Sequence, residues 1–125
     1  MMSGMANWTI VRLELGQTRD FPQGSPLRHY LLSLPLREDS TIDEQVQAAQ
    51  PHHVTVRRFW PQEPDRRGHL VKVSLGWAFS YMASGQDGPH FCQLRDHAFV
   101  PQETVTIAEA PSLSLPFCVA EMSAR

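Results

Sequence analysis

Histidine and cysteine side chains lie close together in one part of the chain, and such residues can bind a metal. His90 and Cys92 are two positions apart, which places both on one face of a strand, and His97 follows shortly after them. Zinc needs three or four nitrogen or sulfur ligands that converge tetrahedrally. Neither Cys-x-x-Cys nor His-Glu-x-x-His occurs in the sequence. We therefore favour ordinary loop and strand histidines over a metal site, and we expect no cofactor.

The two cysteines, Cys92 and Cys118, raise a second possibility, which is a thiol nucleophile. A reactive cysteine needs a neighbouring histidine and a lowered pKa, whereas a free cysteine usually behaves as a small buried apolar residue. The sequence has no glycine-rich phosphate loop and no Gly-x-Ser-x-Gly elbow. A small metal- or thiol-dependent enzyme that uses His90, Cys92 and His97 is thus the alternative function. A non-enzymatic domain that binds a small ligand or a protein is the preferred one.

The most unusual segment is Val-Arg-Arg-Phe-Trp-Pro at 56–61, and a second arginine pair follows it closely. Adjacent arginines and aromatic rings can form a cation–π surface that recognises an anion. In the alternative interpretation, which we favour, the aromatic rings belong to the core and the arginines make solvated or cross-strand contacts. If a ligand site exists here, its residues are Arg57, Arg58, Trp60, Arg66 and Arg67.

The elements that would position these residues are strands. Apolar residues alternate with polar or small ones over 104–108 and 113–120, which predicts a hairpin over 103–121. A similar alternation over 54–59 and 70–81 predicts further strands in the middle of the chain.

Two positions in this middle region need an explanation. The alternation breaks its phase at Arg57 and Arg58, and a β-bulge at this point would return the apolar residues to one side. Gly76 marks either a tight turn or a bend within one long strand.

The first half of the chain adds two strands, at 8–15 and 27–34, and one helix near 41–50 with Ser40 or Thr41 as its N-cap. Six or seven strands with one short helix predict a mainly β fold. We expect a small, partly open β-barrel that the helix covers at one end, with a β-sandwich as the alternative.

Size and composition support one folded domain. The chain has 125 residues, of which 42% are hydrophobic and 19% charged. We expect a single domain over 1–125, with 1–7 as a flexible N-terminal tail. The formal net charge is −2, so we expect neither nucleic acid nor an anionic membrane as a partner.

The setting and partners follow from the same features. No apolar run is long enough for a membrane helix, and the N-terminal residues lack the pattern of a signal peptide. We therefore expect a cytoplasmic protein. Its expected partner is a small ligand or a protein, and an exposed strand edge would also permit a homodimer.

Two segments carry a resemblance to other proteins. At Arg57-Arg58-Phe59-Trp60-Pro61, and at 97–107 with its His-x-Phe-x-Pro turn, the chain resembles a group of short uncharacterised bacterial β-rich proteins. The resemblance implies a similar strand and a Pro-Gly turn before the last hairpin. Here Gln102 stands where the resemblance implies glycine. It covers parts of 53–121, implies no activity, and supports one complete bacterial domain.

Overall fold

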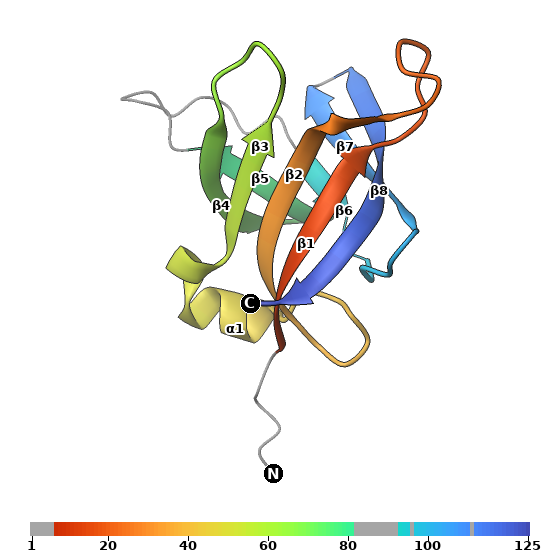
Figure 1. Cartoon of the computed structure of the whole chain (residues 1–125). Coiled ribbons are helices and arrows are strands. Elements are labelled where there is room, and N and C mark those ends of the chain that lie inside the picture. Colours follow the sequence, from red (N-terminus) through yellow and green to blue (C-terminus); the bar gives the residue numbers. More distant parts are fainter. Residues whose placement is uncertain (1–6, 82–92, 96, 111) are drawn as a thin grey trace.

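Strands that follow one another in chain order form a closed antiparallel barrel in the computed structural model of this protein (Figure 1). The structure describes residues 7–81, 93–95, 97–110 and 112–125. Within these residues the strands are β1 (Asn7–Leu15), β2 (Ser25–Leu36), β3 (Thr55–Phe59), β4 (Arg66–Val73), β5 (Gly76–Tyr81), β6 (Gln93–Arg95), β7 (Thr104–Ala110) and β8 (Leu113–Ala124). β8 pairs with β1 and closes the barrel.

The structure confirms the mainly β class and the barrel, and it corrects two details. The barrel has eight strands rather than six or seven, and it is closed rather than partly open. The strand that the sequence pattern missed is β6, because three residues are too short to show an alternation. The predicted hairpin is confirmed as β7 and β8. Gly76 begins β5 after a tight turn. Of the expected N-terminal tail, residues 1–6 lie outside the described residues, and Asn7 belongs to β1 instead.

The single α-helix of the described residues, α1 (Glu44–Ala49), lies at the end of the barrel where the C-terminus also lies (Figure 1). Its N-cap is Asp43, whose carboxylate accepts hydrogen bonds from the two backbone N–H groups of Gln45 and Val46. The expected caps Ser40 and Thr41 are wrong, because both belong to the preceding turn. A short 3₁₀ helix (Pro51–His53) follows and leads into β3.

Inward-facing apolar side chains fill most of the barrel. Successive strand residues point to opposite faces, so every second residue of each strand enters the interior. The burial of these side chains removes apolar surface from water and is the main force that holds the barrel together. The largest fully buried side chains include Tyr30, Phe79, Phe99, Phe117 and Trp77.

The predicted β-bulge at Arg57 and Arg58 is wrong. β3 pairs with β2 and β4 without a shift of register, so Arg57 faces outward and Arg58 inward. The apolar alternation breaks because an arginine occupies an interior position, and not because the backbone inserts a residue. Phe59 then faces outward, where its ring stacks on His29 at 4.7 Å.

The loop before β7 contains a tight turn at the position of the expected glycine. The N–H of Glu103 donates to the carbonyl of Val100 at 3.0 Å, which closes a four-residue turn. Gln102 has a φ of 75°, in the left-handed region that favours glycine. The turn is therefore present although its third residue is glutamine.

Candidate functional site

The five residues that we proposed for ligand binding lie on different faces of the barrel wall, because successive residues of a strand point to opposite faces. Arg57 and Arg67 are direct cross-strand partners on the outer wall of the barrel, and both are exposed. Arg58 and Arg66 are also partners, but they lie on the inward side. Arg58 is buried, whereas Arg66 is exposed at the start of β4. These residues therefore do not form one surface, and the two arginine pairs must be considered separately.

Arg58 belongs to a group of polar side chains, which we call the buried arginine cluster: the buried Arg58, Glu109 and Tyr30, together with Glu63 from the exposed loop after β3. Its guanidinium donates to the Glu109 carboxylate and to the Glu63 carboxylate, each at 3.0 Å. The Tyr30 hydroxyl donates to the other oxygen of Glu109. Only 8% of the Arg58 side chain and 8% of the Glu109 side chain are exposed, so water screens this ion pair little.

The surroundings of Arg58 keep it charged. Burial by itself would lower the pKa of Arg58, but the adjacent Glu109 carboxylate, the Tyr30 oxygen and the hydrogen bonds to Glu109 and Glu63 raise it above its usual value. The Trp60 ring lies 4.0 Å below the guanidinium and adds a cation–π contact. Arg58 and Trp60 thus stabilise the end of the barrel away from α1.

A further arginine stands at the same end of the barrel. The Arg28 guanidinium lies 4.1 Å from the centre of the Phe21 ring and donates to the Ser25 hydroxyl. Arg66 lies 5.7 Å from the centre of the Tyr81 ring. Sequence reasoning missed Arg28, because nothing in the local pattern marks it as a neighbour of Trp60, whose ring centre is 5.9 Å away.

On the outer wall, Arg57 and Arg67 form what we call the outer arginine pair. They line a groove of about 290 Å³ together with Thr55, Val56, Gly68 and His69. Neither arginine has an ion pair with any described residue. The Arg57 guanidinium lies 4.8 Å from the centre of the Phe59 ring, so an aromatic face adjoins the pair.

His29 continues this aromatic face along the outer wall. Its ring stacks on the Phe59 ring at 4.7 Å, with an angle of 16° between the two planes. Burial, followed by the nearby positive charge of Arg12, lowers the pKa of His29 below its usual value. The ring is therefore neutral at pH 7, and it adds a stacking surface rather than a charge.

The residues of the metal and thiol hypotheses lie partly within the described part of the chain. Among them, no group of three or more His, Cys, Asp or Glu side chains is placed to hold a metal ion. His90 and Cys92 lie outside the described residues. His97 is described, and its ring stacks on Phe99 at 5.4 Å. Cys118 is half-buried on β8.

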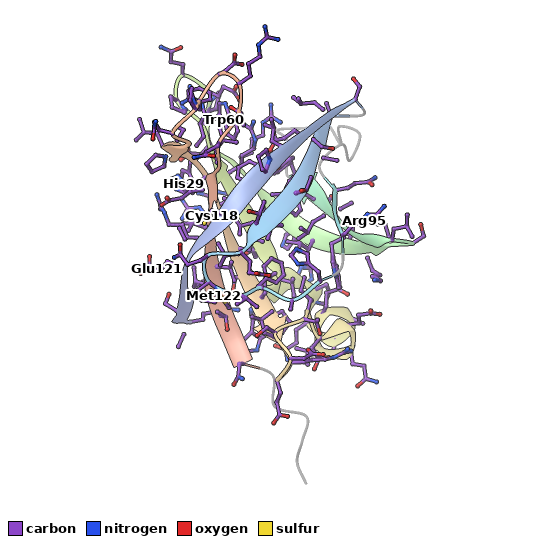
Figure 2. All side chains as sticks on the ribbon, turned by 90° about the vertical axis from the view of Figure 1, so that its right-hand side faces the viewer. His29, Trp60, Arg95, Cys118, Glu121 and Met122 are labelled. Carbon is purple, nitrogen blue, oxygen red and sulfur yellow. The ribbon has the colours of Figure 1, made fainter. Side chains whose placement is uncertain are left out.

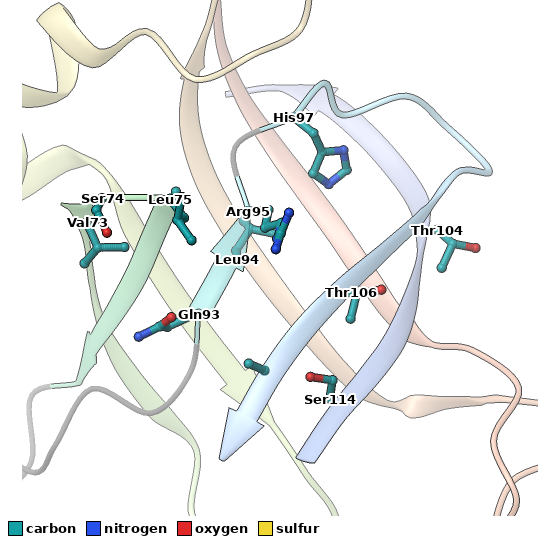
Figure 3. A pocket seen from close by; sticks show the side chains of 12 residues that line it. Val73, Ser74, Leu75, Gln93, Leu94, Arg95, His97, Thr104, Thr106 and Ser114 are labelled. Carbon is teal, nitrogen blue, oxygen red and sulfur yellow. The ribbon is translucent and has the colours of Figure 1, made fainter. Parts of the chain in front are cut away.

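A larger groove of about 580 Å³ lies elsewhere on the wall, and we call it the β6–β7 groove (Figure 3). This groove is far from the aromatic face of His29: Figure 2 shows His29 and Arg95, which lines the groove, on opposite sides of the barrel, with Trp60 near one end. Of the residues that line this groove, the sequence marks His97 alone as a candidate site residue. Its lining comes from β6, β7, the β4–β5 turn and β8, and includes Leu75, Gln93, Arg95, His97, Thr106 and Ser114.

Searches for similar proteins found no family model, no curated protein and no solved structure that matches this chain. The resemblance to short bacterial proteins therefore stays a prediction. Among the described residues there is no helix long and apolar enough to cross a membrane. The function must be inferred from the geometry of the grooves and of the charged side chains.

Proposed function

We propose that this protein is a small-ligand-binding β-barrel that takes an oxyanion, such as a phosphate group, at the outer arginine pair. One observation carries the proposal. Arg57 and Arg67 lie directly opposite each other on neighbouring strands, both are exposed, and neither has an ion pair with a described residue. Like charges directly opposite each other destabilise a sheet. An anion bound between them would offset that cost.

The chemistry of the groove supports an oxyanion. A guanidinium presents several N–H donors in one plane, which matches the oxygens of a phosphate or a carboxylate. The Thr55 hydroxyl and the His69 ring belong to residues that line the same groove. At about 290 Å³, the groove is at the small end of the range of small-molecule sites, about 300–1,000 Å³. This size suits a charged head group.

The neighbouring rings favour a head group joined to a small organic part. Phe59 and His29 extend from Arg57 along the outer wall as an apolar face. A flat group attached to the anion would pack against this face. A polynucleotide fits less well, because the chain has a net charge of −2 and lacks the excess of positive charge that drives nucleic-acid binding.

The test compares a charged probe with a neutral one. Methyl phosphate and uncharged trimethyl phosphate are titrated into ¹⁵N-labelled protein at low salt, and amide shifts are followed. We expect methyl phosphate to shift the amides of Arg57 and Arg67, and trimethyl phosphate to leave them in place. Arg57→Gln and Arg67→Gln should each weaken binding about tenfold, as expected for one lost charge-assisted hydrogen bond. Arg19→Gln is the matched control, since Arg19 is exposed in the β1–β2 loop.

The same variants distinguish a binding role from a structural one. Because each substitution removes one member of a like-charge pair, the free energy of unfolding should stay unchanged or rise by about 0.2–1 kcal/mol in phosphate-free buffer. Urea denaturation measures this. If Arg57→Gln and Arg67→Gln instead lose stability while methyl phosphate binds as before, the arginines are structural and the proposal is wrong.

A further inference from the structure

We propose that the β6–β7 groove is a second binding site, and that it takes a small carboxylate with an apolar tail. This site is separate from the outer arginine pair and does not depend on the function proposed above. It combines an exposed cation, hydroxyl side chains and an exposed apolar side chain in one groove of about 580 Å³. That volume lies within the range of small-molecule sites, about 300–1,000 Å³.

The cation is Arg95, the last residue of β6. It is exposed and has no ion pair with any described residue. Figure 3 shows its side chain extending into the groove between Leu75 and Thr106, with the His97 ring above it. His97 stacks on Phe99, which is buried, so the His97 ring has a fixed position at the edge of the groove. A carboxylate is an anion that this guanidinium can bind through two parallel hydrogen bonds.

Hydroxyl groups beside Arg95 supply further polar contacts. Thr106 of β7 and Ser114 of β8 both line the groove. Both side chains are exposed, and Figure 3 shows them on the groove wall together with Arg95.

The Thr106 hydroxyl can donate to one carboxylate oxygen while the Arg95 guanidinium donates to the other. Arg95 and Thr106 can therefore hold the two oxygens of one carboxylate.

The apolar part of the groove lies next to this polar part. Leu75, in the turn between β4 and β5, is 72% exposed. Val73 and Ala108 also line the groove. An apolar tail packed on these side chains would remove them from water, and each buried CH₂ group contributes about 0.8 kcal/mol before other costs. A ligand with a carboxylate and a short hydrocarbon chain matches both parts.

The test uses hexanoate and hexan-1-ol, which share a tail and differ in the charged group. Each is titrated into ¹⁵N-labelled protein while amide shifts are recorded. We expect hexanoate to shift the amides of Leu75, Arg95 and Thr106, and to bind at least about tenfold more tightly than hexan-1-ol. Equal affinity for the two probes, or shifts confined to other parts of the barrel, would overturn the proposal.

Variants then assign the contacts. Arg95→Gln should weaken hexanoate about tenfold and leave hexan-1-ol unchanged, whereas Leu75→Ser should weaken both. Arg37→Gln, at another exposed arginine, is the control and should change neither. Thermal melting confirms that each variant is folded. Unchanged hexanoate affinity in Arg95→Gln contradicts the proposal. Arg67→Gln should leave hexanoate binding intact, so a failure at one site is distinguishable from a failure at the other.

Discussion

At the scale of single residues, Arg58 is a charged side chain that lies in the core of this barrel. It occupies an interior position in the middle of an otherwise apolar strand face, and two carboxylates hold it there. A buried ion pair adds little net stability when it is compared with apolar residues of the same size, but the removal of one partner is costly. The arginine is therefore a part of the core, and its role differs from that of its exposed neighbour Arg57.

We predict that Arg58→Met lowers the free energy of unfolding by about 3–5 kcal/mol, since it leaves the buried Glu109 carboxylate without the Arg58 cation. Glu109→Gln removes that charge while it keeps an acceptor for the Tyr30 hydroxyl. The double variant should therefore be more stable than Arg58→Met alone. Urea denaturation of the two single variants and the double variant measures the coupling. Additive effects would mean that the two side chains do not interact in solution.

At the scale of elements, the residues of β3 show what an alternation pattern can conceal. The sequence placed a phase break at Arg57 and Arg58 and predicted a bulge, but the register of β3 is regular. The pattern alone cannot distinguish an inserted residue from a charged residue that faces inward. Only the partner of Arg58, which is Glu109 on β7 and far away in the chain, makes the second arrangement stable.

The turn before β7 gives a prediction at this scale. Gln102 adopts a φ of 75°, which costs a residue other than glycine about 1–2 kcal/mol. Gln102→Gly should therefore raise the free energy of unfolding, by up to about 1 kcal/mol after the greater flexibility of glycine in the unfolded chain is included. Thermal and urea denaturation measure it.

Gln17→Gly is the matched control for this turn. Gln17 is an exposed loop glutamine that is not among the described residues with a positive φ, so the substitution should be neutral or destabilising. If both substitutions change stability in the same direction by the same amount, the strain at Gln102 is not the cause.

At the scale of the whole molecule, the strands of the closed barrel differ in how many backbone pairs they form with their neighbours. β1 pairs along its length with β2 on one side and β8 on the other, whereas β6, within the part of the chain that the structure describes, pairs with β7 at Gln93 and Leu94 alone. Local opening is easiest where few backbone hydrogen bonds and apolar contacts must be broken. The β6–β7 groove therefore lies beside the weakest part of the wall.

We predict that the protected amides of β6 exchange with solvent at least about tenfold faster than those at the centre of β1. Native-state hydrogen exchange followed by NMR measures both sets. Low concentrations of urea should speed the exchange of β1 strongly and that of β6 weakly, because only global unfolding exposes β1. Identical rates and identical urea dependence in the two strands would show that the barrel opens only as a whole.

Part of the candidate sites could be predicted from the sequence. Arg57 and Arg67 were among the proposed ligand-binding residues, because two arginine pairs beside aromatic residues are unusual. Their separation from Arg58 and Arg66 requires the register between β3 and β4. Arg95 could not be predicted, since its importance depends on the groove that β6, β7 and the β4–β5 turn form together.

The sequence by itself determined the local features: the β class, the hairpin of β7 and β8 and the short helix. Side-chain alternation acts over a few positions, so it is visible in a single segment. Only the tertiary structure decided that the barrel closes and that Arg58 faces inward. Thr9 pairs with Ala124 and Arg58 binds Glu109 across large separations in the chain, and no local pattern specifies which distant segments will meet.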